Sequence, residues 1–388
     1  MTLNIEGFVA PGFERVAEEF ERNFADRGEV GAAFAAVRDG RPVVDLWGGL
    51  ADRAAARPWR QDTLQLIFSG TKGLVAVCLL MLIDRGLLGL DDLVADHWPE
   101  FAAEGKGHLR VRDVVSHQAR MPGIRSPLAE ADLTDPRRLA GLLAAQAPDP
   151  DPRAGLVYHA LTHGWLAGEL IRRVDGRTVG RFFAEEVAAP LGLDVWIGLP
   201  AAYEHRVSTL EYAPDWGTGP AADPRQLADD ALFGRIWRNP PVFPADRIPW
   251  NSRAFHEAEI PGAGAIGTAR SMARLYGCLA GGGVLDGGTL LGPAALEQGR
   301  SPLAEGTDPF SGDPMAYGVG FQLQTPLRAL GPAPDAFGHD GAGGSVHAAW
   351  PQKRVGFSYC MNRLRDAEPV DSRRRALLTA LWRSAEDR

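Results

Sequence analysis

Apolar residues in the first part of the chain follow two different periods, one helical and one strand-like. Between residues 13 and 24 they recur every three or four positions, which predicts an amphipathic helix. Two apolar runs follow at 31–37 and 42–49, on either side of an Asp39-Gly40 pair. Such a pair between apolar runs is typical of the turn of a β-hairpin. We therefore expect a helix and two antiparallel strands near the N-terminus.

A long helix of mostly apolar residues is predicted next, over residues 69–85. The run from Gly73 to Ile83 contains no polar side chain, so the helix is expected to be buried on all sides. Gly86 follows and can end it. Between about 90 and 250 the pattern changes, because Pro and Asp interrupt short helical stretches. These stretches lie at 136–145, 161–173 and 179–188.

The C-terminal third again mixes helix and strand patterns. Helices are predicted over 269–280 and 370–383. Three strand-like segments lie between them, at 316–322, 346–350 and 355–361. Because the strands cluster instead of alternating with helices, an antiparallel sheet is favoured over a parallel one.

Together these patterns predict an α+β fold. Residues 1–90 and 251–388 are expected to form one domain, an antiparallel β-sheet flanked by helices and built from both chain ends. Residues 91–250 are expected to form an all-helical or mostly helical insertion domain. Within the insertion, the Pro-, Trp- and Asp-rich segment 213–249 shows little periodicity and is expected to be a long irregular excursion.

Composition and charge narrow the range of partners. The 388 residues are 45% hydrophobic and 23% charged, which is typical of a globular protein. The formal net charge of −8 leaves no basic stripe to neutralise phosphates, so nucleic acid is not expected as a partner. The arginines at 373–375 are interpreted as the solvated face of the last helix.

Cysteine spacing and hydropathy favour a cytoplasmic protein without a metal or a cofactor. Cys78, Cys278 and Cys360 lie far apart in apolar surroundings, which predicts buried thiols in a reducing compartment. No apolar run reaches about 18 residues and no export signal is visible, so no membrane partner is expected. The GxGxxG match at 262–267 lacks a buried strand before it, so a dinucleotide site is not expected.

Ser69 and Lys72 are the strongest candidates for chemistry. Residues three apart on a helix share a face, so Lys72 is expected beside the Ser69 hydroxyl. A serine hydroxyl is a poor nucleophile until a neighbour takes its proton, and a buried lysine with a lowered pKa can do so. Only three of the 41 basic residues are lysines, which makes one at an apolar helix notable. The alternative is a snorkelling lysine beside a helix-capping serine.

Two further segments carry candidate groups. Tyr158 precedes a predicted helix, and near Ser69 its phenol would be able to pass a proton to a leaving group; simple packing is the alternative. Residues 338–345 include four glycines beside a strand, which permits close backbone approach to a ligand. A backbone N–H of this segment, paired with that of Ser69, would form an oxyanion hole; a turn between strands is the alternative.

Taken in order along the chain, these elements resemble the serine β-lactamase and penicillin-recognising superfamily. The resemblance is closest to class C β-lactamases and family VIII carboxylesterases, and it extends over nearly the whole chain. It implies an antiparallel sheet flanked by helices, with an all-helical domain and the active site between them. It also implies that Ser69 is the acylated nucleophile, Lys72 its base and Tyr158 the proton relay.

The same resemblance assigns the substrate-binding residues. His339-Asp340-Gly341 stands where the lactamases have Lys-Thr-Gly, so His339 and Gly341 are expected to face the substrate. The N–H groups of Ser69 and Ala342 are expected to form the oxyanion hole.

Three positions depart from the lactamase pattern. Ala160 replaces the Asn of Tyr-x-Asn, and His339 replaces the Lys of Lys-Thr-Gly. Arg120 stands where the family usually has Gly. A histidine is mostly uncharged at neutral pH, so the fixed positive charge for a substrate carboxylate is weakened. These changes favour neutral acyl substrates over β-lactams and cell-wall peptides.

The favoured function is therefore a carboxylesterase acting on a small-molecule ester through an acyl-enzyme. An acyltransferase uses the same acyl-enzyme and stays an alternative, as does a weak β-lactamase or peptidase. A non-catalytic binding protein is disfavoured by the intact serine, lysine and tyrosine.

Two roles stay open for Trp216, Trp237 and Trp250: they line an acyl pocket, or they pack in the ordinary way. His159 and His163 lack a glutamate between them and are interpreted as core or supporting residues.

Overall fold

An antiparallel sheet forms the centre of the molecule. The computed structural model describes residues 4–218, 227 and 229–386. Within this part of the chain, the sheet contains the strands β1 (Ile5–Val9), β2 (Gly31–Arg38), β3 (Arg41–Asp52), β4 (Arg57–Pro58), β11 (Ala304–Thr307), β12 (Pro314–Tyr317), β13 (Gln322–Leu323), β14 (Phe337–Asp340), β15 (Val346–Trp350) and β16 (Val355–Met361). Their spatial order is β1-β3-β2-β16-β15-β14-β13-β12-β11, with β4 beside β3.

Both chain ends contribute to this sheet, as the sequence predicts. Strand β2 pairs with β16, from Ala32 opposite Met361 to Arg38 opposite Val355. Strands β2 and β3 form the predicted hairpin. The two turn residues, Asp39 and Gly40, have φ values of 50° and 75°, as the favoured two-residue hairpin turn requires.

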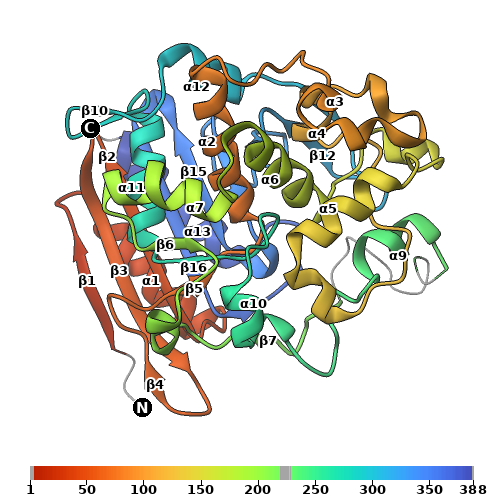
Figure 1. Cartoon of the computed structure of the whole chain (residues 1–388). Helices are drawn as coiled ribbons and strands as arrows, with labels where there is room; N and C mark the ends of the chain where they lie inside the picture. Colours follow the sequence, from red (N-terminus) through yellow and green to blue (C-terminus); the bar gives the residue numbers. More distant parts are fainter. Residues whose placement is uncertain (1–3, 219–226, 228, 387–388) are drawn as a thin grey trace.

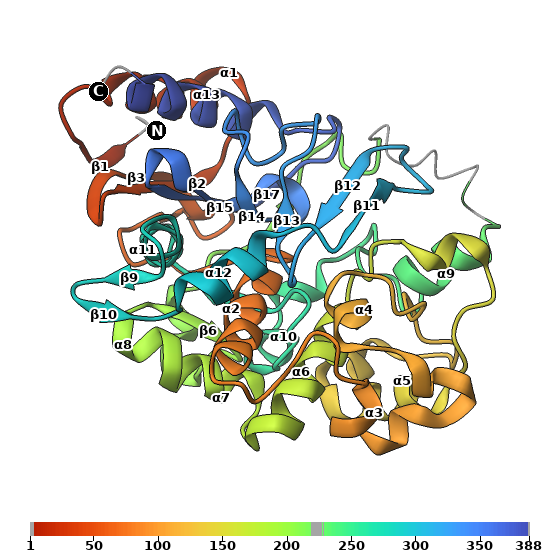
Figure 2. The same cartoon turned by 90° about the horizontal axis from the view of Figure 1, so that it is seen from above.

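Helices cover the two faces of the sheet differently (Figures 1 and 2). On one face lie α1 (Glu14–Asp26) and α13 (Ser372–Glu386), which pack on each other. On the other face α11 (Ala269–Ala280) packs on β2, β15 and β16. Next to α11 on that face lies α2 (Gly70–Asp84), which also contacts β14. The helices predicted at both ends of the chain are therefore confirmed, and the sheet is buried between two helical layers.

A further set of helices lies between residues 94 and 300. These are α3 (Val94–His97), α4 (Val111–Val115), α5 (Pro136–Ala145), α6 (Thr162–Asp175), α7 (Val179–Phe183), α8 (Ala189–Leu191), α9 (Ala231–Trp237), α10 (Arg253–Glu257) and α12 (Pro293–Arg300). A π-helical turn at Ala184–Ala188 joins α7 to α8, and 3₁₀ turns lie at Pro99–His108, Glu130–Thr134, Pro152–Gly155, Ala201–Arg206, Pro249–Asn251, Ala342–Gly344 and Pro351–Lys353. The middle of the chain is therefore mostly helical.

Three small sheets complete the fold. Strand β8 (Ala265–Gly267) lies between β5 (Gln65–Leu66) and β6 (Val195–Ile197), β7 (Glu211–Tyr212) pairs with β17 (Arg363–Leu364), and β9 (Val284–Leu285) pairs with β10 (Gly288–Thr289). Because β6 pairs with β8, the middle of the chain is hydrogen-bonded to the C-terminal part. We propose residues 91–250 as an insertion, and the division at 90 and 250 stays a prediction.

Helix α2 is the central helix of the molecule, and its sequence explains why. Every residue from Gly70 to Leu82 is buried, so the helix has no solvent face. It contacts the helices α6, α7 and α12 as well as β14. Its end comes at Gly86, whose φ is +67°, a conformation that glycine adopts without strain. The N-terminus of α2 is consequently fixed in the interior, between the sheet and the helical layer.

The arginines of the last helix do not form a solvated face, and that interpretation is wrong for two of the three. Arg373 is completely buried, and its guanidinium pairs with Glu29 at 3.0 Å and with Asp371 at 2.7 Å. Arg374 is 4% exposed and pairs with Asp340 at 3.0 Å. Buried charges are tolerated when they are paired in this way. These two side chains therefore attach α13 to the rest of the molecule.

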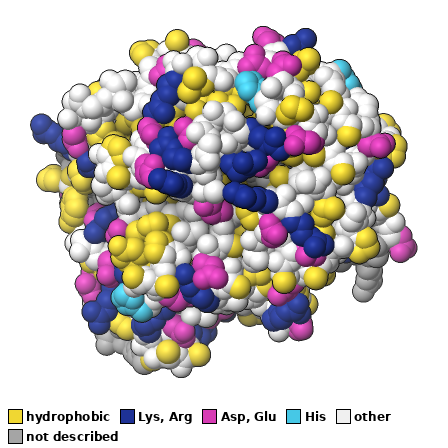
Figure 3. All heavy atoms as spheres, in the orientation of Figure 1, with side chains coloured by type: hydrophobic (Ala, Val, Ile, Leu, Met, Phe, Trp, Pro, Cys, Tyr) yellow, Lys and Arg dark blue, Asp and Glu magenta, His cyan; other side chains and the backbone are white. Residues whose placement is uncertain are grey.

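The surface and the helix lengths give two simpler findings. On the face shown in Figure 3, Lys and Arg side chains are interspersed with Asp and Glu. Across the described ranges, each helix is too short or too polar to cross a bilayer.

Candidate active site

Ser69 lies at the N-terminal end of α2, in a turn whose shape is fixed by its neighbours. The N–H groups of Gly70, Thr71 and Lys72 each donate to the carbonyl three residues earlier. This tight winding puts Lys72 one turn after Ser69, as the spacing predicts. Phe68, just before the serine, has a φ of +46°, which is strained for a bulky residue.

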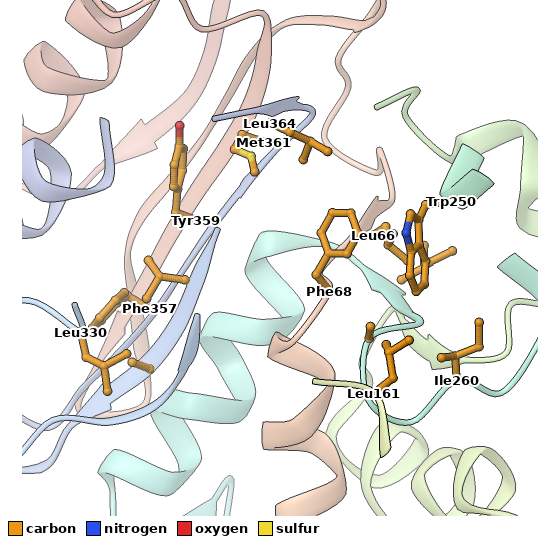
Figure 4. Close-up of a cluster of buried hydrophobic side chains, with 14 of the residues drawn as sticks. Leu66, Phe68, Leu161, Trp250, Ile260, Leu330, Phe357, Tyr359, Met361 and Leu364 are labelled. Carbon is orange, nitrogen blue, oxygen red and sulfur yellow. The ribbon is translucent and has the colours of Figure 1, made fainter. Parts of the chain in front are cut away.

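The strained Phe68 is held in place by aromatic packing. Its ring lies 5.5 Å from that of Trp250 and 5.6 Å from that of Phe243, centroid to centroid. Figure 4 shows the Phe68 and Trp250 rings side by side at the start of α2. Strained backbone is maintained only where the surroundings determine it strongly, and here it turns Ser69 toward a cavity.

Two side chains meet the hydroxyl of Ser69. Lys72 Nζ lies 3.1 Å from Ser69 Oγ, and the Tyr158 hydroxyl donates to the same oxygen at 2.7 Å. Lys72 Nζ also lies 4.8 Å from the centroid of the Tyr158 ring. The structure therefore brings together all three predicted catalytic residues, although Tyr158 is 89 positions away from Ser69.

Lys72 is completely buried, and its amine is held by two carbonyl groups. Nζ donates to the carbonyl oxygens of Ala160 and Gly262, each at 2.7 Å. Gly164 lets the Gly262 segment approach, because a Cβ there would lie 1.9 Å from the nitrogen of Gly262. Burial lowers the pKa of Lys72 to about 7, against a smaller opposing effect of the Asp340 carboxylate. A substantial fraction of Lys72 is thus neutral near pH 7 and able to accept the serine proton.

Burial has the opposite effect on Tyr158. It raises the pKa of the phenol well above its usual range, although the hydrogen bond to Ser69 lowers it somewhat. The phenol therefore keeps its proton at neutral pH. It is a hydrogen-bond donor beside Ser69, and Lys72 stays the predicted base.

We predict an acidic limb in the pH profile of ester hydrolysis, with a midpoint near pH 7. Only neutral Lys72 can accept a proton, so kcat/KM should rise with pH through the Lys72 pKa and level off about one unit above it. Below the midpoint the decrease should approach tenfold per pH unit. The profile is measured with an uncharged ester between about pH 5 and pH 9, and an unchanged kcat/KM down to pH 5 would contradict the assignment.

Three buried, neutral histidines lie beside Tyr158 and the residues that follow it: His117, His159 and His163. The His117 ring lies 4.9 Å from that of Tyr158 and 4.7 Å from that of His163, centroid to centroid. His117 Nδ1 accepts the N–H of His159 at 3.0 Å, which fixes the backbone after Tyr158. Burial lowers the pKa of His159 to about 4 and those of the other two further. His159 and His163 are supporting residues, as interpreted, and His117 is an addition.

The glycine-rich segment lies directly against the turn that carries Ser69. A Cβ at Gly341 would lie 2.4 Å from the carbonyl oxygen of Ile67 and 2.4 Å from Ser345 Oγ. Only glycine allows this approach. Ser69, Gly341 and Ala342 line the same cavity, which agrees with the expected oxyanion hole. The roles of Ser69 and Ala342 N–H groups stay a prediction.

Replacing Gly341 by alanine is expected to lower kcat about 10²-fold to 10³-fold, the usual effect of losing one oxyanion donor. Its φ of −129° suits any residue, so the cost is steric: the new Cβ would push the loop away from Ile67 and displace the Ala342 N–H. Gly141→Ala is the matched control, because a Cβ there meets nothing within 4 Å. Steady-state kinetics with a p-nitrophenyl ester give the result, and equal kcat for both variants would contradict the oxyanion role.

The last helix also supports this segment, which sequence reasoning missed. Arg373 Nη2 donates to the carbonyl of Gly343 at 3.0 Å. Arg374 Nη1 donates to Asp340 and to the carbonyl of Ser345. The only sign of this support in the sequence is the run of three arginines at 373–375. Such a run does not show that two of them contact residues 29 to 34 positions away.

His339 is buried and lines the cavity, as expected for the residue at the lactamase lysine position. Its Nδ1 lies 2.7 Å from the carbonyl of Asp340. Burial and, to a smaller extent, the charge of Lys72 lower the pKa of His339 to about 4. The ring is therefore neutral at neutral pH, so it provides no cation for a substrate carboxylate.

The cavity in front of Ser69 has a volume of about 480 Å³ and one aromatic wall. The wall consists of Trp216, Phe233, Trp237, Phe243 and Phe310. Trp216 and Trp237 thus line the cavity as one interpretation proposed. Trp250 does not: it is 1% exposed and packs on Phe68 and Phe255 in the core.

Arg120 shows how the chain tolerates a departure from its family pattern. Its φ is +55°, in the region where glycine is at ease. Its guanidinium donates to the carbonyls of Asp149 and Asp151 at 2.7–3.1 Å. These hydrogen bonds offset the strain at this position.

Comparisons with known proteins identify the family of the chain. The family described as Beta-lactamase matches residues 16–381. Esterase/beta-lactamase LipL of Mycobacterium tuberculosis is 36% identical over 92% of this chain and 83% of its own length. A crystal structure of a family VIII carboxylesterase superposes with a TM-score of 0.89 and 39% identity, over 98% of this chain and 100% of that one. Monacolin J acid methylbutanoyltransferase of Aspergillus terreus is 26% identical over 46% of this chain and 48% of its own.

The chain therefore belongs to the β-lactamase family, and the predicted family and fold class are confirmed. Its enzyme class within that family is a carboxylesterase-type serine hydrolase.

Proposed function

We propose that the protein is a carboxylesterase that cleaves small or medium esters with a neutral acyl group, through an acyl-enzyme on Ser69. The observation that carries this proposal is the contact of Ser69 Oγ with both Lys72 Nζ and Tyr158 OH, at the bottom of an open cavity. A nucleophile, a base with a pKa near neutrality and a proton donor are the three groups that acyl transfer needs.

In the acylation step, neutral Lys72 takes the Ser69 proton while Oγ attacks the ester carbonyl carbon. The carbonyl oxygen gains negative charge, which N–H groups of Ser69 and Ala342 would stabilise. The tetrahedral intermediate collapses as the alcohol leaves. Tyr158 gives its proton to the departing oxygen and recovers one from Lys72, so charge does not build up on the phenol.

In the deacylation step, water takes the place of the alcohol. Lys72 accepts a proton from the water, whose oxygen attacks the acyl carbon and releases the acid. Ser69 then regains its proton. An alcohol in place of water gives acyl transfer through the same intermediate, and a partial relative that is named as a transferase supports this as the second candidate.

Ala160 and neutral His339 argue for an ester over a β-lactam. Ala160 contributes its carbonyl to Lys72, but its methyl group has no hydrogen bond to offer an amide. His339 offers no positive charge to a carboxylate. Both groups that would hold a β-lactam nucleus are thus absent at these positions.

The proposal is tested by presenting a fluorophosphonate, a p-nitrophenyl ester and nitrocefin to the purified protein. We expect a single fluorophosphonate adduct on the peptide that contains Ser69, rapid ester turnover and slow nitrocefin turnover. An adduct on another residue would overturn the assignment of the nucleophile. Nitrocefin turnover that exceeds ester turnover in kcat/KM would reverse the order of the two activities.

The reaction products distinguish acyl transfer from hydrolysis. With an added alcohol, hydrolysis yields only the acid, whereas transfer yields a new ester at the expense of the acid. We expect mainly acid in water and a minor fraction of new ester that increases with alcohol concentration.

We also propose a cytoplasmic location. The three cysteines are buried and unpaired, which suits a reducing compartment. Fractionation of cells that produce the protein, followed by immunodetection, tests this location.

A further inference from the structure

The cavity in front of Ser69 is lined by carboxylates and, among its described residues, by no lysine or arginine. Four carboxylates line it, and these belong to Asp308, Asp313, Asp340 and Asp366. Nothing in the proposed ester hydrolysis uses them. The carboxylates therefore indicate a property of the substrate beyond its ester bond.

Three of these four carboxylates have no ion-pair partner in the described part of the chain. Asp340 is the exception, because it pairs with Arg374. Burial raises the pKa of Asp366, the N–H of Gly217 lowers it, and the neighbouring Asp215 raises it again. The nearby guanidinium of Arg153 is already bound to Asp151 and Asp230 at 2.7 Å each.

The buried side chain of His339 provides an independent observation. Its Nδ1 contacts the Asp340 carbonyl at 2.7 Å, so Nδ1 carries the hydrogen and Nε2 is left as an acceptor. Nε2 is buried and has no partner among the described residues. A lysine at this position would donate hydrogen bonds to an anion. The neutral histidine instead has an acceptor without a partner at Nε2.

These groups lie on the side of the site where the alcohol leaves. Tyr158, which would protonate the leaving oxygen, has its ring 6.0 Å from that of His339 and 6.2 Å from that of Tyr317, centroid to centroid. Burial raises the pKa of Tyr317, and the nearby carboxylates of Asp308 and Asp340 raise it further. Hence His339 and Asp340 lie near Tyr158, and Asp308 lies near the neighbouring Tyr317.

We propose that the alcohol part of the preferred substrate carries a protonated amine, bound through its N–H by His339 Nε2 and by the charge of the surrounding carboxylates. This inference rests on the proposed esterase function and adds the class of alcohol to it. The aromatic wall is left for the neutral acyl group. The ammonium group takes no part in bond making, so the reaction keeps the acylation and deacylation steps given above.

Four butyrate esters that differ in the alcohol test the proposal. They are 2-(dimethylamino)ethyl butyrate, which is protonated at neutral pH, butyrylcholine, 3,3-dimethylbutyl butyrate and the anionic 3-(butyryloxy)propanoate. The first two carry a positive charge, but only the first has an N–H. The third is a neutral molecule of nearly the same shape as butyrylcholine. Released acid is titrated to obtain kcat/KM for each ester, at low and at high salt.

We expect kcat/KM to decrease in the order protonated amine, quaternary amine, neutral, anionic. The cationic-to-neutral ratio should be about tenfold or more at low salt and should decrease at high salt, because attraction between charges is screened. A neutral ester cleaved as well as the protonated one would overturn the proposal. Equal rates for the protonated and the quaternary ester would overturn the part assigned to His339.

Substitutions locate the effect. Asp313→Asn and Asp308→Asn should each lower the cationic-to-neutral ratio of kcat/KM severalfold. The asparagine oxygen at position 308 would still accept the N–H groups of Phe310 and Ser311 that Asp308 holds, so the loop is kept in place. Glu21→Gln removes the same charge from the exposed face of α1 and should leave the ratio unchanged. An unchanged ratio in both Asp variants would overturn the proposal.

The same four esters distinguish a failure of the proposed charge preference from a failure of the proposed esterase function. If the neutral ester is cleaved by wild type and not by Ser69→Ala, the esterase function stands whatever the preference for charge. If none of the four esters depends on Ser69, the proposed function itself fails. His339→Lys gives a further readout, since a cation there should shift the preference toward the anionic ester.

Discussion

Ser69→Ala is expected to lower kcat for a p-nitrophenyl ester by about 10⁴-fold to 10⁶-fold, the range found when a serine nucleophile is removed. The variant keeps Lys72 and Tyr158 but has no oxygen to form the acyl-enzyme. Ser69 Oγ is the point where both of these side chains meet, so no other hydroxyl replaces it. The measurement is burst and steady-state release of p-nitrophenol.

A second serine in the same cavity provides the matched control. Ser311 also lines the cavity, but its hydroxyl is hydrogen-bonded within its own loop, to Asp308 and to the N–H of Asp313. Ser311→Ala should keep kcat within a few-fold of wild type. Equal ester turnover by wild type and Ser69→Ala would remove the basis of the proposed mechanism.

Lys72→Ala is expected to lower kcat by about 10⁴-fold, the upper end of general base catalysis. It also leaves the carbonyls of Ala160 and Gly262 without their donor, which should lower the free energy of unfolding by about 1–3 kcal/mol for each. Thermal unfolding therefore accompanies the kinetics, and kcat is normalised to folded protein. Lys72→Arg supplies a donor that cannot become neutral, so it should be as inactive as Lys72→Ala.

Lys106 is the matched control for Lys72. Its amine is also buried and donates to three carbonyls, those of Ala103, Ala144 and Gln146, but no serine hydroxyl is among its partners. Lys106→Ala should lower stability and leave kcat per folded molecule near that of wild type. If the two lysine variants lose kcat equally, Lys72 acts through stability and not as a base.

Tyr158→Phe separates the base from the proton relay. Removal of the phenolic hydroxyl should lower kcat about 10²-fold, but the acidic limb of the pH profile belongs to Lys72 and should stay near pH 7. Loss of that limb in the phenylalanine variant would instead assign the titrating group to the tyrosine.

Many of the helices and strands followed from short-range patterns, but the segment predicted as strand at 316–322 was not one strand: β12 ends at Tyr317 and β13 begins at Gln322. The helix over 269–280 and the strands at 346–350 and 355–361 have the predicted bounds, and the hairpin turns at Asp39-Gly40. Such elements depend on local periodicity and turn residues. The antiparallel sheet also followed, because clustered strands leave few other arrangements.

The spacing of Ser69 and Lys72 identifies them as a candidate pair. The rarity of lysine in the chain adds little, because it does not distinguish Lys72 from Lys106. Lys106 is another of the three lysines and is also buried, yet its amine donates only to carbonyl groups. What distinguishes Lys72 is the serine one turn earlier on the same helix. The pair was predictable because three residues of helix suffice to bring the two side chains together.

The errors lay where burial decides. The run of arginines predicts a solvated face, whereas Arg373 and Arg374 are buried; of the two roles open for Trp250, the structure shows packing in the core. The identity of a charged or aromatic residue does not show whether its side chain is buried or exposed. Some of its partners lie far away in the sequence and follow no local pattern: Glu29 is 344 positions from Arg373, and Asp340 is 34 positions from Arg374.

The sequence by itself determined the elements of this protein, the family that its motifs resemble, and the serine and lysine pair on one helix, because these depend on residues close together in the chain. Tertiary structure alone decided that the Lys72 amine meets the Gly262 carbonyl 190 residues later, and that Gly341 lies against Ile67. It also decided the protonation of the site. Burial brings the pKa of Lys72 to about 7 and leaves His339 neutral, since the cost of removing a charge from water depends on everything packed around it.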